Sequence, residues 1–262
     1  MDHVDVGRYW NDNAEVWTQL TRAGYDKYRD VVNTPGFLAM LPDVQGREGL
    51  DIGCGEGHNT RLLAARGAKM SALDISEVFI GHARAEEARA PLGIAYRVAS
   101  AVEVPYPDAS FDFATAFMSL MDIPEKGRVF AEAWRVLRPG GFLQFSIEHP
   151  CYATPHRRNL RDADGQTYAM EVGGYFRGRQ GQVEEWIFNA APVEVKAGLR
   201  RFRVPRFTLT LSAWFNLLLE SGFVIERVGE PSPTDEEVQS TPYVQDAQVL
   251  AYFLHVRVRK PG

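Results

Sequence analysis

The sequence of 262 residues has only two cysteines and no long apolar run. Cys54 and Cys151 are too few for a disulfide framework, so we expect reduced thiols in a cytoplasmic protein. No signal-peptide pattern is present, and no apolar stretch reaches the roughly 18 residues of a membrane-spanning helix. The net charge of −5 lacks the basic excess that is typical of nucleic-acid-binding proteins. We therefore expect neither a membrane nor a nucleic acid as partner, and a homo-oligomer remains open.

Glycine, in contrast, recurs at a regular interval in one segment. Gly53, Gly55 and Gly57 occupy every second position directly after an apolar run that ends at Asp51, and a helical pattern follows at once. This order predicts a strand, a tight turn and a helix N-terminus. Glycine allows positive φ and lets a ligand approach the main chain, while the first turn of a helix has free N–H groups. The segment is therefore suited to binding a polar small molecule.

Two common ligand classes fail the spacing test. The dinucleotide fingerprint needs a glycine where His58 stands, and the Gly-Lys-Ser/Thr ending of a phosphate-binding loop is absent. Asp74 instead ends the next apolar segment, 19 residues after Gly55. An acidic residue at this spacing is placed to accept hydrogen bonds from both hydroxyls of a ribose. The pattern predicts a nucleoside derivative that lacks a pyrophosphate.

The segment Asp51-Ile52-Gly53-Cys54-Gly55-Glu56-Gly57, the later Asp74, and Arg135-Val136-Leu137-Arg138-Pro139-Gly140-Gly141 together resemble the class I S-adenosylmethionine-dependent methyltransferases. The resemblance covers residues 45–148 and, more weakly, the strand pattern near the C-terminus. It implies S-adenosylmethionine as cofactor. It also implies a Rossmann-like α/β fold, whose mostly parallel seven-stranded sheet has helices on both faces and a last strand antiparallel to its neighbours. Another doubly wound nucleotide-binding protein is the alternative.

We expect one domain over residues 1–262, with the cofactor-binding core at 43–149 and 208–262. Residues 1–42 are predicted to form a helical cap, and the glycine-rich, aromatic residues 150–207 an inserted β-rich substrate lid. The Thr34-Pro35 pair predicts a helix start, and Pro42 its end. Further strands are expected at 69–73, 94–98, 111–117, 142–147, 223–228 and 249–257, helices at 76–90, 125–137 and 208–221, and a polar loop at 231–242.

The resemblance assigns cofactor contacts to positions in this sequence. They are Asp51, Gly53, Cys54, Gly55, Asp74, Ile75, Ser100, Ala101, Val102, Phe117 and Met118. Ser100 departs from the family pattern, because an Asp that accepts from the adenine amine is frequent there. Phe117 and Met118 follow from position, since ligands of open α/β sheets bind beyond the carboxyl ends of the strands.

Substrate contacts are expected from aromatic residues and one histidine. Tyr9, Trp10 and Trp17 lie in the N-terminal segment, which is either an ordinary packing helix or a cap over the cofactor. Tyr175 belongs to the predicted lid, and His149 follows the fifth core strand, where it is either structural or functional. We predict catalytic roles for Tyr9, His149 and the cofactor-side Phe117, and no metal site.

The expected chemistry depends on the acceptor atom. An amine needs only a desolvating aromatic pocket that favours its neutral form, whereas a phenol or alcohol needs a positioned base, such as His149, or a metal. We therefore predict methyl transfer to an amine nitrogen of a small molecule. O-methylation with His149 as base and a non-catalytic cofactor-binding protein are the alternatives. Tyr9-Trp10, residues 146–151 and the long lid are similar to the N-methyltransferases of lincosamide antibiotic pathways, which implies antibiotic biosynthesis.

Overall fold

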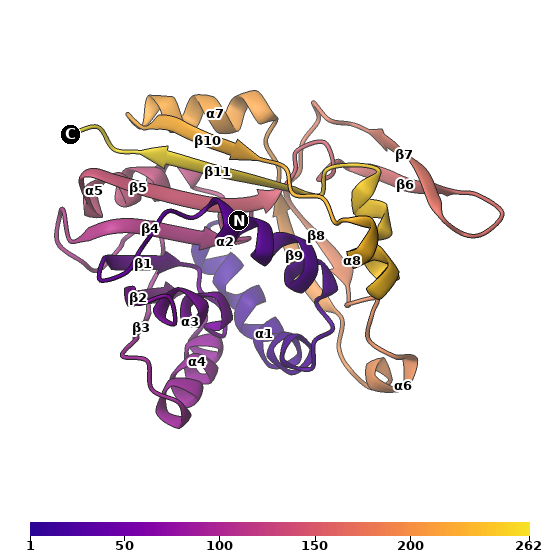
Figure 1. Cartoon of the computed structure of the whole chain (residues 1–262), viewed down its shortest axis with the longest axis horizontal. Coiled ribbons are helices and arrows are strands. Elements are labelled where there is room, and N and C mark those ends of the chain that lie inside the picture. The colour runs from indigo at the N-terminus through magenta and orange to yellow at the C-terminus, as the bar shows by residue number, and fades with distance from the viewer.

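The computed structural model describes residues 1–262 and has a seven-stranded sheet at its centre (Figure 1). The strand order is β10-β11-β5-β4-β1-β2-β3, and β11 pairs antiparallel with both of its neighbours while the other pairs are parallel. The strands are β1 (Glu48–Ile52), β2 (Lys69–Asp74), β3 (Ala95–Val98), β4 (Phe111–Phe117), β5 (Leu137–Glu148), β10 (Val224–Gly229) and β11 (Phe253–Arg259). This confirms the predicted Rossmann-like methyltransferase fold.

Helices cover both faces of the sheet. They are α3 (His58–Ala64), α4 (Glu77–Arg89), α5 (Lys126–Val136) and α7 (Leu211–Glu220). Two of them begin at a side-chain cap: Ser76 Oγ accepts from the Phe79 N–H of α4 at 3.2 Å, and Thr210 Oγ1 accepts from the Ala213 N–H of α7 at 3.2 Å. Each cap satisfies a helix N–H that has no partner within the helix.

The central strand β4 is apolar on both faces, as a buried parallel strand is expected to be. Phe113 and Phe117 belong to the core that α2 (Thr34–Met40), α3 and α4 cover, whereas Ala114 and Ala116 belong to the core that contains Phe130 of α5. The alternation follows the two-residue period of a strand. Packing on both faces fixes the position of the carboxyl end of β4, where Phe117 and Met118 lie.

The N-terminal segment folds into α1 (His3–Arg22), the π-helix η1 (Arg29–Asn33) and α2 (Thr34–Met40). Helix α2 begins at Thr34, as predicted, but Thr34 is not its N-cap, because η1 runs into α2 with Asn33 already helical at φ −69°. The Thr34 hydroxyl instead contacts the Asn59 amide oxygen at 3.1 Å. The predicted end is confirmed: Leu41 is extended in front of Pro42, as the residue before a proline prefers.

The insertion forms two hairpins, β6 (His156–Arg161) with β7 (Thr167–Gly173), and β8 (Gln180–Trp186) with β9 (Phe202–Phe207), and the short α6 (Val193–Lys196). The second hairpin lies at the two short β-like runs of the insertion sequence, 183–188 and 200–207, whereas the first was not predicted. The polar loop expected at 231–242 is also wrong in part, because α8 (Asp235–Ser240) and the 3-10 helix η3 (Pro242–Gln248) lie there. A further 3-10 turn, η2 (Leu120–Asp122), follows β4. Figure 1 shows α1, η1 and the insertion gathered beyond the carboxyl ends of the central strands.

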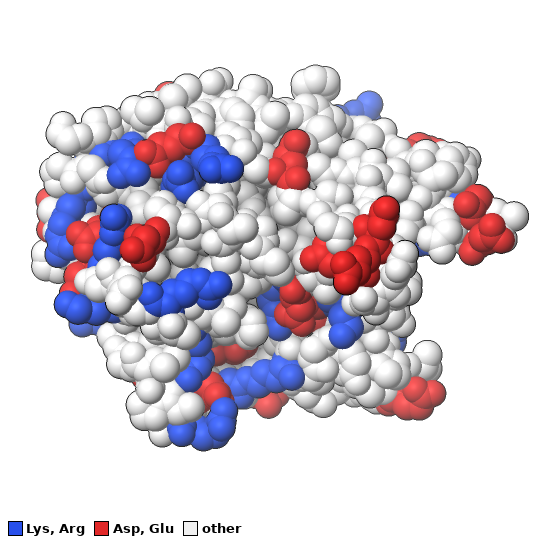
Figure 2. Space-filling model, in the orientation of Figure 1, with Lys and Arg blue, Asp and Glu red and all other residues white.

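Charge on the molecular surface is mixed. Figure 2 shows Lys and Arg side chains interspersed with Asp and Glu on the visible face, without one continuous basic area. No helix of the structure is long and apolar enough to cross a membrane. Neither observation identifies a partner, so the expectations on membranes and nucleic acids remain predictions.

Candidate active site

A cavity of about 980 Å³ opens where the carboxyl ends of the core strands meet α1, η1 and the insertion. Its wall combines residues that are far apart in sequence, from His3 in α1 to Phe253 in β11. Both aromatic and charged side chains line it. A cavity of this size accommodates a nucleoside-sized ligand together with a second small molecule.

The glycine turn has the geometry that its sequence predicts. Gly55 has φ +55° and open space where a Cβ would stand, and it lines the cavity. Gly57 has φ +87°, and a Cβ there would lie 2.6 Å from the Tyr96 hydroxyl of β3. Gly57 therefore allows the turn to pack against the neighbouring strand, while Gly55 leaves the main chain open to a ligand.

Asp74 closes this turn at the end of β2. Its Oδ2 accepts the Gly55 N–H at 2.9 Å, and its Oδ1 accepts the Ser76 N–H at 2.9 Å. The side chain is buried yet lines the cavity, and burial raises its pKa against these two hydrogen bonds. A carboxylate with two oxygens has about four acceptor positions. Asp74 therefore retains acceptors for ligand hydroxyls while it fixes the turn.

Asp51 has a different surrounding, although it also borders the cavity. Its Oδ1 accepts from the Thr115 hydroxyl of β4 at 2.8 Å and its Oδ2 from the Thr60 hydroxyl of α3 at 2.6 Å. The side chain is 1% exposed, and burial raises its pKa to about 6. Asp51 thus ties β1 to β4 and to the start of α3, which positions the glycine turn.

Ten of the eleven predicted cofactor residues line this one cavity. They are Asp51, Gly53, Cys54, Gly55, Asp74, Ile75, Ser100, Ala101, Phe117 and Met118. Val102 does not, because its side chain lies in the core and its N–H donates to the Ser100 hydroxyl at 3.3 Å. Met118 has a positive φ of 53°. Residues other than glycine rarely adopt this backbone conformation, and those that do are often found at functional sites.

The structure places Tyr9 and Tyr175 outside the cavity. Trp10 and Trp17 are seven residues apart and share one face of α1, whereas Tyr9 is turned about 100° from Trp10. The Arg203 guanidinium lies 5.2 Å from the Tyr9 ring. The Tyr175 hydroxyl accepts the Leu211 N–H at 2.8 Å, at the start of α7. Neither residue has a contact with the cavity that a substrate role requires.

His149 also lies behind the cavity wall rather than in it. Its Nδ1 accepts the Cys151 N–H at 3.1 Å, and its Nε2 lies 2.9 Å from Glu230 Oε1. The side chain is buried, and this burial lowers its pKa below the ordinary value although Glu230 opposes the shift. The predicted position at the end of β5 is thus correct, but the ring is engaged in the β5–Cys151 turn.

Replacing His149 with glutamine should therefore change turnover little. We expect kcat to fall less than about threefold, in contrast to the roughly 10²-fold or greater loss that follows removal of a general base. The thermal midpoint should fall, because the Cys151 N–H loses its acceptor. Steady-state kinetics and a melting curve of the same preparation test this prediction. A decrease of about 10²-fold in kcat with an intact fold would show that His149 is catalytic.

Trp10 and Trp17 do border the cavity, as predicted, and they join α1 to the insertion. The Trp17 ring lies 5.4 Å from Trp10, 5.6 Å from Trp186, 5.0 Å from Phe188 and 4.8 Å from Phe202, centre to centre. These separations are in the range of edge-to-face aromatic packing. One aromatic cluster therefore holds cap and insertion together over the carboxyl ends of the strands.

Sequence reasoning missed the charged residues of the substrate side. The cavity wall includes four charged residues, Asp122, Glu148, Glu184 and Arg206. It also includes two tyrosines, Tyr28 directly before η1 and Tyr252 directly before β11. Glu148 is the last residue of β5, and Asp122 lies in the turn that follows β4, so their places at the carboxyl ends of apolar core strands were the available signal. Glu184 and Arg206 lie on the second hairpin, which carries no motif.

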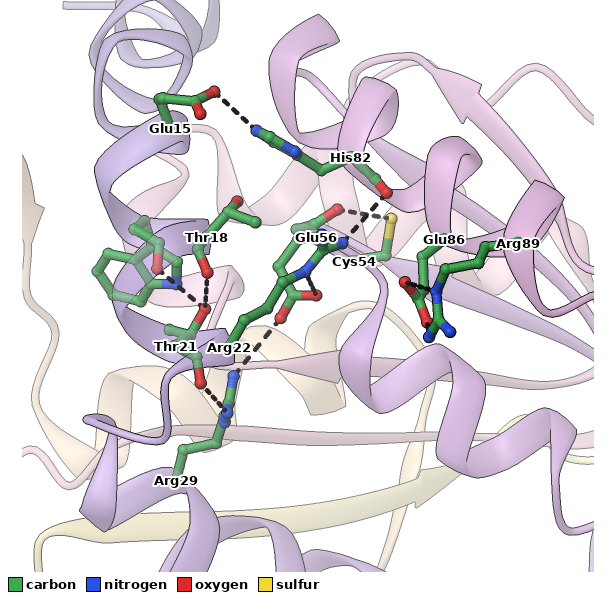
Figure 3. Close-up of polar contacts among 12 residues, drawn as sticks. Glu15, Thr18, Thr21, Arg22, Arg29, Cys54, Glu56, His82, Glu86 and Arg89 are labelled. Carbon is green, nitrogen blue, oxygen red and sulfur yellow. Dashed lines mark hydrogen bonds and ion pairs between the residues drawn. The ribbon is translucent and has the colours of Figure 1, made fainter.

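Glu56 of the glycine turn contacts the N-terminal cap. Figure 3 shows its carboxylate between two guanidiniums, with Arg29 Nη1 at 3.5 Å and Arg22 Nε at 4.0 Å. Arg29 also donates to the Thr21 carbonyl, and Arg22 to the His82 carbonyl. Burial raises the pKa of Glu56 against both cations. The cofactor turn and the cap are thus joined by a partly buried ion pair.

Replacing Glu56 with alanine should lower the free energy of unfolding by about 1–3 kcal/mol, because two guanidiniums lose their acceptor and the buried side chain leaves a void. Urea denaturation measures the change. The matched control is Glu86→Ala, whose carboxylate pairs with the exposed Arg89 (Figure 3) and should have little effect. Equal midpoints for the two variants would show that Glu56 does not hold the cap.

The comparisons with known proteins agree with this site. The methyltransferase domain family model matches residues 50–145. A crystal structure of an S-adenosylmethionine-dependent methyltransferase from Mesorhizobium loti is 31% identical, covers 86% of this chain and 96% of its own, and has a TM-score of 0.69.

Two curated relatives are similar to about half of the chain. The 27-O-demethylrifamycin SV methyltransferase of Amycolatopsis mediterranei is 36% identical over 138 residues, which is 52% of this chain and 47% of that protein. A ubiquinone/menaquinone biosynthesis C-methyltransferase of Acidiphilium cryptum is 39% identical over 125 residues, 45% and 50% respectively. The chain spans about half the length of these curated relatives.

A parallel sheet of this order, with a glycine turn after β1 and an acidic residue at the end of β2, defines a nucleoside-binding α/β protein. The structure from Mesorhizobium loti identifies the family within this class, because the chain is similar to almost the whole length of that protein. The chain belongs to the class I S-adenosylmethionine-dependent methyltransferases. Its cofactor is S-adenosylmethionine, as the sequence predicts, and the open space at Gly55 and the remaining acceptors of Asp74 fit this molecule.

Proposed function

We propose that this protein transfers a methyl group from S-adenosylmethionine to an amine nitrogen of a small molecule. One observation carries the choice of acceptor: eight Asp or Glu residues line the cavity, against five Lys or Arg residues. An excess of carboxylates raises the local concentration of a cationic ligand. The tryptophans of α1 and the insertion add faces that attract a cation.

Residues of the core would bind the cofactor. Asp74 and the main chain at Gly53 to Gly55 would hold the nucleoside, and Ser100 and Ala101 border the same region. When bound, the cofactor supplies a methyl group on a positively charged sulfur, which is a good leaving group. The protein therefore has to exclude water and to align the acceptor, and alignment alone contributes several kcal/mol to catalysis.

The aromatic walls suit an amine in a second way. An amine enters as an ammonium ion that the carboxylates attract, but it must lose a proton before its lone pair can attack. Desolvation in a partly apolar cavity lowers the pKa of an amine and so favours the neutral form. An alcohol or phenol would need a base within hydrogen-bond reach instead, and the base that the sequence predicts for this reaction, His149, lies outside the cavity.

O-methylation is the second candidate, because the relative from Amycolatopsis is named for an O-demethylated rifamycin and another curated relative is an O-methyltransferase of Penicillium expansum. We favour a natural-product acceptor in either case, and antibiotic biosynthesis, including the lincosamide type, is the extension of this proposal. The roles of residues 1–42 as cap and 150–207 as lid belong to the same proposal, and both segments contribute to the cavity wall.

The test is methyl transfer from labelled S-adenosylmethionine to matched acceptors. Benzylamine and tryptamine represent the amines, and benzyl alcohol and tryptophol have the same carbon skeletons with a hydroxyl group. We expect label on the amines only. Label on the alcohols alone would favour the O-methyl candidate. Tight binding of S-adenosylhomocysteine without transfer to any acceptor, natural-product panels included, would favour a non-catalytic protein.

A further inference from the structure

Asp122 is a buried carboxyl group without a partner. It ends the turn η2 beyond β4, its residue is 3% exposed, and it lines the cavity. The side chain takes part in no hydrogen bond, and its Oδ1 is fully enclosed without a donor. Buried polar atoms are nearly always paired in folded proteins, and an unpaired carboxylate is costly. The carboxyl group therefore has no donor within the protein, and a ligand in the cavity can supply one.

The cations near Asp122 do not supply that donor. Arg206 of β9 uses its guanidinium on Glu148 at 3.3 Å and Glu184 at 2.8 Å. Lys126 of α5 donates its ammonium to the carbonyls of Met121 and Ile123, at 3.2 and 2.8 Å. Both cations already have acceptors, so they reduce the cost of charge on Asp122 without bonding to it.

The charges that face Asp122 come from three elements. Arg206 and Lys126 lower its pKa, Glu148 of β5 raises it, and burial outweighs them all, so that the pKa rises to about 7. The carboxyl group can thus gain and lose a proton near neutral pH, as a group that exchanges protons in catalysis must. Asp51, by contrast, is bound through both oxygens to threonine hydroxyls.

We propose that Asp122 is a catalytic residue that binds the acceptor N–H and takes up the proton that the nitrogen loses on methylation. The proposal rests on the proposed function. In the step, the nitrogen lone pair forms the new N–C bond, and the S–C bond breaks with its electron pair left on sulfur. The N–H bond then breaks with its pair left on nitrogen, and the proton passes to Asp122, which becomes the neutral acid. One methyl group and one proton move, and no oxidant or reductant is needed.

The test compares Asp122→Asn with a matched control, Glu125→Gln. Glu125 lies three residues away and also influences Lys126, but its carboxylate contacts His3 Nδ1 at 3.0 Å and is not part of the cavity wall. With the amine of the panel that the native protein methylates fastest, we expect kcat of Asp122→Asn to fall about 10²-fold. S-adenosylhomocysteine affinity should stay within about twofold, and Glu125→Gln should keep native kcat.

A second readout does not need a substrate. The pKa of Asp122 is 3.8 in the unfolded chain and about 7 in the folded protein. Ionisation of this carboxyl group therefore disfavours folding, and this cost increases as the pH rises from 3.8 to about 7. Asp122→Asn removes this cost, so its thermal midpoint should exceed the native one by a margin that grows over that window and is constant above it. The variant should therefore fold. In the native protein kcat/KM should fall as the pH drops below about 7, because Asp122 becomes protonated and can no longer accept a proton, and this decrease should be absent from the variant.

The outcomes separate the two proposals. A native protein that methylates an amine, together with an Asp122→Asn variant of equal kcat or with the same decrease of kcat/KM at low pH, would overturn the role of Asp122 alone. A native protein that binds S-adenosylhomocysteine but methylates only hydroxyl groups would contradict the proposed amine acceptor. If Asp122→Asn melts below the native protein at pH 8, Asp122 is structural and the inference is wrong.

Discussion

Replacing Asp74 with alanine should lower the affinity for S-adenosylmethionine at least tenfold. The carboxylate is buried at the cavity wall and offers acceptors that ribose hydroxyls can use, and each hydrogen bond to a charged group contributes about 1.5–3 kcal/mol. The same substitution removes the acceptor of the Gly55 N–H, so the glycine turn loses its fixed conformation as well. Both effects reduce binding, and titration calorimetry with S-adenosylhomocysteine measures their sum.

The control for this experiment is Asp108→Ala. Asp108 is exposed and pairs with Arg135, away from the cavity wall, so the affinity should equal that of the native protein. Circular dichroism checks that Asp74→Ala retains its fold. Unchanged affinity in a folded Asp74→Ala protein would remove Asp74 from the cofactor site, and with it the main support for the nucleoside position.

Replacing Trp17 with alanine should have the largest effect on the cap. The ring packs against four aromatic neighbours of α1 and the insertion, and its loss leaves a void that these rings cannot fill. We expect a decrease of about 2–4 kcal/mol in the free energy of unfolding, toward the lower end of large-to-alanine changes because the ring is only half-buried. Turnover should fall more than tenfold, because water then enters the cavity from the cap side.

Phe176→Ala is the matched control for Trp17→Ala. Phe176 belongs to the same insertion but is 88% exposed, so its removal should change neither stability nor turnover noticeably. Denaturation curves and single-turnover methyl transfer give the two quantities. If Trp17→Ala is destabilised but transfers methyl at the native rate, the cap is a structural support and does not shape the site.

Much of the core fold was predictable because its signals are local. Strand β4 was predicted at 111–117 and lies there, since an apolar run bounded by turn residues specifies a buried strand. The hairpin β6–β7 was missed because β6 carries charged residues on both faces. Cross-strand ion pairs of Glu171 with His156 and Arg158 join them, and such pairs become visible only when the register is known.

The same contrast holds for helix α8. The Thr234 side chain and Glu237 form a reciprocal capping box, and this Thr-x-x-Glu spacing was present in the sequence. The segment was interpreted as a loop because its residues are polar throughout. A capping signal therefore outweighed the missing apolar period in this short helix.

The cavity residues of the first βαβ unit were predictable from the sequence, and those of the opposite cavity wall were not. Gly55 and Asp74 belong to one βαβ unit, whose spacing along the chain fixes their spacing in space. Asp122, Glu184 and Trp17 come from η2, β8 and α1, which meet only through tertiary packing. Tyr9 shows the limit of the helical argument, because it shares α1 with Trp17 but faces Arg203.

The most direct test of the account is the product formed from an acceptor that carries both kinds of nucleophile. Tyramine has an amine and a phenol on one small aromatic skeleton, and labelled S-adenosylmethionine marks the atom that is methylated. Tandem mass spectrometry or NMR of the product locates the label. The account predicts N-methyltyramine. An O-methylated product, with nitrogen unlabelled, would contradict methyl transfer to an amine in this carboxylate-rich cavity.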